Sequence, residues 1–85
     1  MNDRWDDEKG SRLLRAALAE IDALSDELSP TRAEALLDEF EWDVRSAFLR
    51  QDLPAVKTTC ERYQRRFRTL AKEAKYHRHT GTKAY

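Results

Sequence analysis

The chain has 85 residues, of which 38% are charged, and it carries two glycines, two prolines and no net charge. A chain this short holds one domain with a small core, and a composition rich in Ala, Leu, Glu and Arg is typical of helical proteins. No segment approaches the ~20 apolar residues of a membrane span, and the acidic first ten residues are unlike a signal peptide. Cys60, the single cysteine, excludes an internal disulfide, so we expect a cytoplasmic protein.

The zero net charge conceals a separation of charge along the sequence. Residues 1–50 contain 7 Lys or Arg and 13 Asp or Glu, a net charge of −6, whereas residues 51–85 contain 9 and 3, a net charge of +6. We expect many of these charges to flank the seam between neighbouring helices, where they fix its register.

The first predicted helix spans about residues 11–28 and follows an acidic N-terminal arm, residues 1–10, of which residues 1–9 either extend the helix or fray from it. Ser11, directly after Gly10, is the expected N-cap. Apolar residues recur at spacings of three and four, which places them on one face of a helix. The stripe consists of Leu14, Ala17, Ile21, Leu24 and Leu28, widened by Leu13 and Leu18.

Two further helices are predicted, at about residues 30–50 and 53–78. Ser29 is the expected N-cap of the first, with Pro30 at its first position, and Asp52 is the expected N-cap of the second. The apolar stripe of the second predicted helix is Ala33, Leu36, Leu37, Phe40, Val44, Ala47 and Phe48. That of the third is Leu53, Val56, Cys60, Tyr63, Phe67, Leu70 and Ala74. A basic, aromatic C-terminal tail, residues 79–85, completes the chain, with Gly81 near the expected C-cap.

These short connections predict that neighbouring helices run antiparallel. The expected fold class is all-α, and two architectures remain open. One is an antiparallel three-helix bundle. The other is a long helical hairpin with a shorter first helix, which completes its core with a second chain. We expect dimerisation because so small a core gives only marginal stability by itself.

The second predicted helix carries apolar side chains on two faces. Phe40 and Trp42 are about 200° apart on a helix, so they cannot face the same core. Residues spaced by seven form a ridge opposite Phe40. We call Ala35, Trp42 and Leu49 the outer ridge, and Asp38 and Arg45 its rim. Exposed large apolar residues with a polar border are typical of protein-binding surfaces.

Three interpretations of the outer ridge remain open. The first predicted helix, or the arm that carries Trp5, could cover it; a second copy of the chain could; or a different protein could. We therefore predict a small, non-enzymatic interaction or adaptor protein that binds a protein partner through this face of the second helix, as a homodimer.

The basic third helix supports an alternative hypothesis, a nucleic-acid-associated accessory protein. Its cations could hold phosphates while aromatic rings of the tail stack on bases. A solvated helix face, or a surface that docks on an acidic protein, explains the same charges. The candidate phosphate-binding residues are Arg65, Arg68, Lys72, Lys75, Arg78 and Lys83, of which we expect Arg68, Lys72 and Lys75 to face solvent.

No residue pattern indicates catalysis, a cofactor, a metal ion or a small-molecule substrate. His77 and His79 diverge by about 200° on a helix, and no Cys or carboxylate lies near enough in the sequence to complete a tetrahedral site. Cys60 lies on an apolar stripe far from both histidines, which indicates a buried structural thiol. We therefore expect no enzymatic activity.

Overall fold

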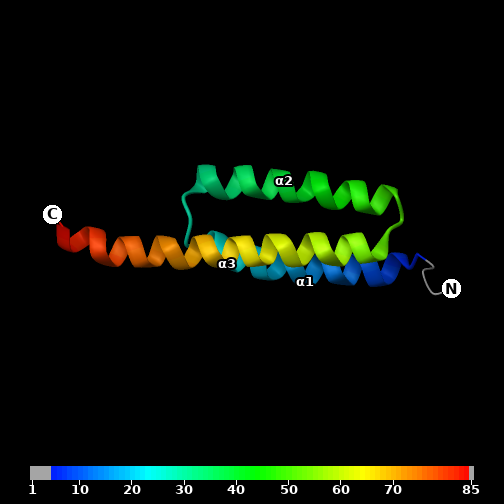
Figure 1. The fold of residues 1–85 in the computed structure, drawn as a ribbon, viewed down its shortest axis with the longest axis horizontal. Helices are drawn as coiled ribbons and strands as arrows, with labels where there is room; N and C mark the ends of the chain where they lie inside the picture. Colours follow the sequence, from blue (N-terminus) through cyan, green and yellow to red (C-terminus); the bar gives the residue numbers. More distant parts are fainter. Residues whose placement is uncertain (1–4, 85) are drawn as a thin grey trace.

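The computed structural model describes residues 5–84, with side chains for residues 5–76, and this range forms three helices and no strand. The helices are α1 (Asp7–Ser25), α2 (Pro30–Leu49) and α3 (Leu53–Ala84), and they pack as an antiparallel bundle (Figure 1). Over the described residues, none of the three combines the length and the hydropathy that a membrane crossing requires.

The starts of α2 and α3 agree with the sequence prediction. Ser29 Oγ accepts a hydrogen bond from the backbone N–H of Arg32 at 3.3 Å, and proline is the first residue of α2. Asp52 Oδ1 accepts from the backbone N–H of Ala55 at 3.1 Å. Between α2 and α3, Gln51 adopts a φ of 52°, a left-handed conformation that reverses the chain direction.

The start of α1 differs from the prediction. The helix begins at Asp7 because the Asp6 carboxylate caps it, accepting hydrogen bonds from the backbone N–H groups of Glu8 and Lys9 at 3.1 and 3.2 Å. Acidic residues in the first turn also suit the positive end of the helix dipole. Ser11 therefore lies inside α1, and part of the predicted acidic arm is helical.

The ends of α1 and α3 also differ from the prediction. α1 ends at Ser25, three residues early, where the backbone N–H of Leu28 bonds to the Ser25 carbonyl at 3.0 Å and closes a tight turn. α3 continues to Ala84, so most of the predicted tail has a helical backbone. Gly81 does not end α3, since a glycine inside a helix costs only about 1 kcal/mol.

The core is built from the predicted apolar stripes, with α3 at its centre. α3 packs closely against both α1 and α2, whereas α1 and α2 make few direct contacts with each other. Phe40 and Tyr63 stack across the seam of α2 and α3 with ring centroids 5.3 Å apart. The buried apolar residues are Ala17, Ile21, Leu28, Leu36, Phe40, Val44, Ala47, Val56, Cys60, Tyr63, Phe67 and Ala71.

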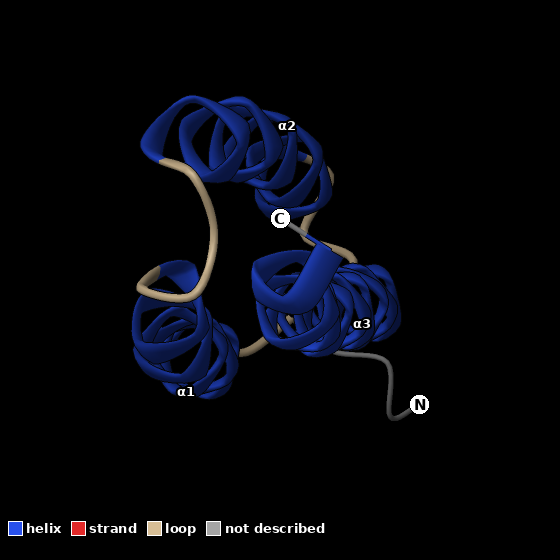
Figure 2. Ribbon diagram, turned by 90° about the vertical axis from the view of Figure 1, so that its left-hand side faces the viewer, coloured by secondary structure: helices blue, strands red, loops and turns tan. Residues whose placement is uncertain are grey.

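The arrangement is elongated, measuring 59 × 19 × 15 Å, because α3 extends past the other two helices at its C-terminal end (Figure 1). Viewed along the bundle, α1 and α2 flank α3 and stand apart from one another (Figure 2).

Candidate interaction surfaces

The outer ridge of α2 is open to solvent. Trp42 is 68% exposed and Leu49 is 78% exposed, and Ala35 is exposed as well, while Phe40 on the opposite face is completely buried. The spacing argument placed these side chains correctly because α2 is a regular helix through its whole length.

The structure does not place α1 or Trp5 on the outer ridge. Trp5 packs edge to face on Phe48, with ring centroids 5.3 Å apart, and its indole N–H donates to Asp7 Oδ1 at 2.5 Å. Gly10 lies directly beneath, where a Cβ would come within 2.9 Å of the Trp5 ring. A glycine in α1 thus lets Trp5 close the end of the bundle, away from Trp42.

A second surface, which sequence reasoning missed, lies between α1 and α2. We call it the interhelical groove. It comprises two open hollows of about 430 Å³ each, which meet at Leu18. The first hollow is lined by Ser11, Leu14, Leu18, Glu41, Val44, Arg45 and Phe48. The second is lined by Arg15, Leu18, Ala19, Ile21, Asp22, Ser25 and Leu37. The sequence did contain a sign of this groove, namely the width of the apolar stripes. Leu18 and Phe48 lie at the edges of their stripes, and contact with α3 alone does not require apolar residues there.

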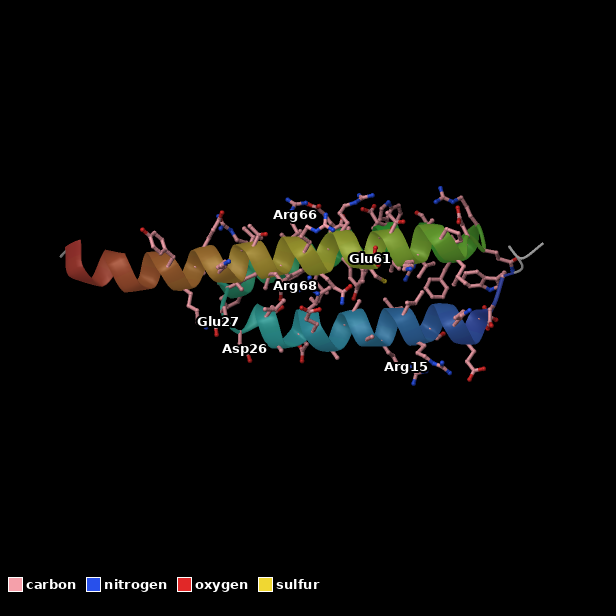
Figure 3. The ribbon with its side chains drawn as sticks, turned by 60° about the horizontal axis from the view of Figure 1, so that its bottom comes forward. Arg15, Asp26, Glu27, Glu61, Arg66 and Arg68 are labelled. Atoms are coloured by element: carbon pink, nitrogen blue, oxygen red, sulfur yellow. The ribbon has the colours of Figure 1, made fainter. Side chains whose placement is uncertain are left out.

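The rim separates the groove from the outer ridge. Asp38 and Arg45 are both exposed, and Arg45 also lines the first hollow of the groove. Arg15 is exposed on α1 and projects away from α3 (Figure 3). Charged side chains therefore border an apolar channel on both of its helices.

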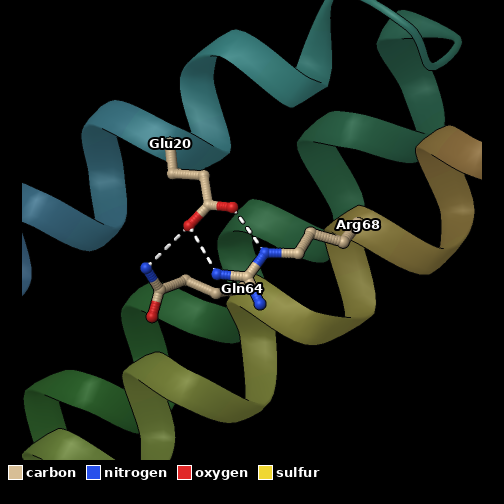
Figure 4. Close-up of polar contacts among 3 residues, drawn as sticks. All are labelled: Glu20, Gln64 and Arg68. Carbon is tan, nitrogen blue, oxygen red and sulfur yellow. Dashed lines mark hydrogen bonds and ion pairs between the residues drawn. The ribbon is translucent and has the colours of Figure 1, made fainter.

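Arg68, one of the predicted phosphate-binding residues, is exposed as predicted, and it is also paired with α1. Its guanidinium pairs with Glu20 of α1 through Nε to Oε2 at 2.5 Å and Nη2 to Oε1 at 2.9 Å (Figure 4). Gln64 Nε2 donates to the same carboxylate at 2.9 Å. The hydrogen bond from Arg68, with the Coulomb attraction and Gln64, holds the pKa of Glu20 below its ordinary value despite partial burial. This cation belongs to the seam of α1 and α3.

The other candidate phosphate-binding residues are less constrained. Arg65, Lys72 and Lys75 are exposed on α3. Arg78 and Lys83 lie on the helical backbone of α3, but their side chains fall outside the described part of the chain. Four of the six predicted cations, including the paired Arg68, are thus exposed on α3.

Two polar contacts fix the seam of α2 and α3. Tyr63 donates its hydroxyl hydrogen to Asp43 Oδ2 at 2.5 Å, and Arg66 lies 3.7 Å from a carboxylate oxygen of Glu39. Burial, followed by the hydrogen bond to Asp43, raises the pKa of Tyr63 to about 12. The separated charges therefore meet partly across helix seams.

Cys60 is buried against this core, and burial raises the pKa of its thiol to about 11. Such a thiol is almost wholly protonated at neutral pH and is a poor nucleophile. Over the residues described, no three metal-ligating side chains gather into one cluster.

Comparison with models of known protein families finds no match for this chain, and searches of curated proteins and of solved structures find none either. Functional inference therefore depends on the two surfaces described above.

Proposed function

We propose that this chain is a non-enzymatic interaction protein that binds a protein partner through the outer ridge of α2 and acts as a homodimer. The observation that carries the proposal is the alignment of Trp42 and Leu49, which are 68% and 78% exposed, on one helix face. Tryptophan is prominent among the residues that dominate binding energy at interfaces. Cys60 is a free thiol, which supports action in a reducing compartment such as the cytoplasm.

The charged rim can select the orientation in which a partner binds the outer ridge. Asp38 and Arg45 carry opposite charges and lie seven residues apart on one edge of the ridge, one before and one after Trp42. Apolar anchors supply most of the affinity of an interface, whereas charged borders steer the partner and exclude wrong alignments. A partner that offers an apolar pocket between one basic and one acidic group fits this arrangement.

Crosslinking in cells of the source organism tests the proposal. A photo-reactive amino acid is placed at position 42 or 49, and as a control at Ala23, which is exposed on α1. The two ridge positions should give the same adduct, and the control position should not. The mass of the adduct distinguishes a second copy of this chain from a different protein.

The partner identified in this way is then purified for a binding measurement. Trp42→Asp should weaken its affinity at least about 30-fold, the loss of an anchor of about 2 kcal/mol, while Ala23→Asp leaves it unchanged. Helical circular dichroism should be the same for both variants, since both positions are exposed. Equal adducts from every position, or an affinity that Trp42→Asp does not change, would contradict the proposal.

Nucleic-acid binding is a second hypothesis, supported by the exposure of Arg65, Lys72 and Lys75 on α3. Binding driven by phosphates weakens steeply as salt rises, whereas association through the outer ridge hardly changes. Binding to DNA or RNA should therefore be measured in low salt and then titrated with salt. The hypothesis fails if the purified protein binds neither polymer at low salt.

A further inference from the structure

The interhelical groove is an incomplete part of the bundle. α1 and α2 each pack against α3 but make few contacts with each other, and their facing apolar side chains remain only partly buried. These half-buried side chains are Leu14, Leu18, Leu37 and Phe48. These residues form two rows, one on each helix. Two further helices that pack along the rows would bury them effectively.

Charges at the mouth of the groove follow a simple order. On α1, Arg15 precedes Asp22 by seven residues; on α2, Asp38 precedes Arg45 by seven residues, and all four side chains are exposed. Because the two helices are antiparallel, the order of charge in space is the same on both. Both arginines lie toward the N-terminal end of α1, and both aspartates lie toward its C-terminal end.

We infer that two copies of this chain pair groove to groove about a two-fold axis that crosses α1 and α2 at right angles. The inference rests on the homodimer of the proposed function and names its surface. The axis places each helix antiparallel to its copy. On α1, Arg15 then meets Asp22 of the second copy; on α2, Arg45 meets Asp38 of the second copy.

The pairing of Arg15 with Asp22 and the pairing of Arg45 with Asp38 place the two-fold axis at the same height along the bundle. The midpoint of Arg15 and Asp22 lies beside Leu18, the residue shared by the two hollows. The midpoint of Asp38 and Arg45 lies beside Glu41, which lines the same hollow as Leu18. A two-fold axis parallel to the helices would instead set arginine against arginine and aspartate against aspartate.

Glu41 lies close to its own copy across this axis. Each Glu41 is one helical turn from Arg45 of its own chain and a similar distance from Arg45 of the second copy, because that arginine faces Asp38. The two carboxylates at the axis are therefore flanked by two guanidinium groups, which compensate their mutual repulsion.

The area of the groove face is sufficient for a dimer. Helices of 19 and 20 residues are about 30 Å long and together about 20 Å wide, so the face buries on the order of 600 Å² per copy. The total of about 1,200 Å² reaches the lower end of stable specific interfaces. In the dimer, the four helices α1 and α2 enclose a shared apolar layer, with α3 of each copy on the outside.

Charge reversal tests this pairing by analytical ultracentrifugation. An acidic variant carries Arg15→Glu and Arg45→Glu, and a basic variant carries Asp22→Lys and Asp38→Lys. Wild type should be a dimer, and each variant alone should dissociate at least about 100-fold more readily, because like charges then face each other at four places. An equimolar mixture of the two variants should recover the dimer. Circular dichroism confirms that each variant is folded.

Two further variants make the test selective. Arg62→Glu with Arg65→Glu makes the same charge change on exposed positions of α3 and should leave the dimer intact. Trp42→Asp should also leave it intact, since the outer ridge lies outside the groove.

Three results would overturn the inference. They are a dimeric acidic variant, a mixture of folded variants that stays monomeric, and a wild type that is monomeric at high concentration. If Trp42→Asp dissociates the dimer and the charge-reversal variants do not, the dimer interface is the outer ridge. That result would contradict the groove pairing but not the proposed function.

Discussion

The hydrogen bond between Tyr63 and Asp43 should make a measurable contribution to the stability of the bundle. The Tyr63 ring is 3% exposed and its hydroxyl donates to Asp43 Oδ2 at 2.5 Å. A hydrogen bond to a charged group contributes about 1.5 to 3 kcal/mol. Because Asp43 is only half-buried and regains some hydration, we expect Tyr63→Phe to lower the free energy of unfolding by about 1 to 2 kcal/mol at pH 7.

Burial of Tyr63, together with its hydrogen bond to Asp43, predicts a specific alkaline sensitivity. The pKa of Tyr63 is about 12 in the folded protein against 10.0 for an unperturbed tyrosine, so the folded state holds the phenolic proton more tightly. The resulting stabilisation is complete below pH 10 and is lost as the pH rises from 10 through 12. A pKa that is higher by about 2 in the folded state corresponds to roughly 2 to 3 kcal/mol of stability. Tyr63→Phe lacks this contribution, so its disadvantage relative to wild type should shrink as the pH rises.

Urea unfolding followed by circular dichroism measures both effects, at pH 7 and at steps toward pH 12 for as long as wild type remains folded. Thr69→Val is a control that removes a hydroxyl from an exposed position of α3, and it should change the free energy of unfolding by less than about 0.5 kcal/mol. A double-mutant cycle with Asp43→Ala should give a coupling energy of about 1 kcal/mol. The reasoning fails if Tyr63→Phe matches wild type in stability at pH 7 and in its dependence on pH.

Three further predictions concern the core and the seams. Phe40→Ala removes a fully buried ring and should cost about 3 to 5 kcal/mol, which is enough to unfold much of the protein at 25 °C; unchanged circular dichroism would contradict it. Arg68→Ala should lower the free energy of unfolding only slightly at pH 7, because its ion pair with Glu20 is largely exposed to solvent. The pKa of Glu20 is lowered from 4.5 in the folded state, so the stabilisation by this ion pair is present above pH 4.5 and is lost as the pH falls through the lowered pKa. An effect of Arg68→Ala on stability that stays constant with pH would refute this assignment. Cys60 should react with a thiol reagent at pH 8 only as fast as the protein opens, so addition of 4 M urea should accelerate labelling sharply; rapid labelling of the folded protein would show that the thiol is accessible.

Local features of the fold could be predicted from the sequence because their causes are local. Ser29 and Asp52 precede proline-containing first turns, and each caps its own helix through a contact three residues away. The opposite orientation of Phe40 and Trp42 follows from helix geometry alone. In the same way, the buried stripe of α3 follows from its spacing.

Features that depend on packing between helices could not be predicted in this way. The Gly10–Ser11 pair resembles a helix start, but Gly10 lies inside α1, where its missing side chain leaves space for Trp5 and Phe48. The pair of Arg68 and Glu20 joins residues 48 positions apart, and its formation depends on the rotation and register of α1 on α3. Spacing gives the direction of a side chain around its own helix but not the distance to the next helix.

The interhelical groove could not be predicted for the same reason, because spacing does not give the distance between α1 and α2. The groove is where the apolar stripes of these two helices leave apolar surface uncovered. The stripes of α1 and α2 are wide enough for two contacts each, yet in one chain each helix packs closely only against α3, and the two make few contacts with each other. In the inferred dimer, the second copy of the chain supplies the second contact. Among the charged residues, Asp38 and Arg45 border both the groove and the outer ridge, so reversing either one affects both surfaces. Trp42 and Arg15 lie on one surface each, so a comparison of Trp42→Asp with Arg15→Glu separates partner binding from pairing of the chain with its copy.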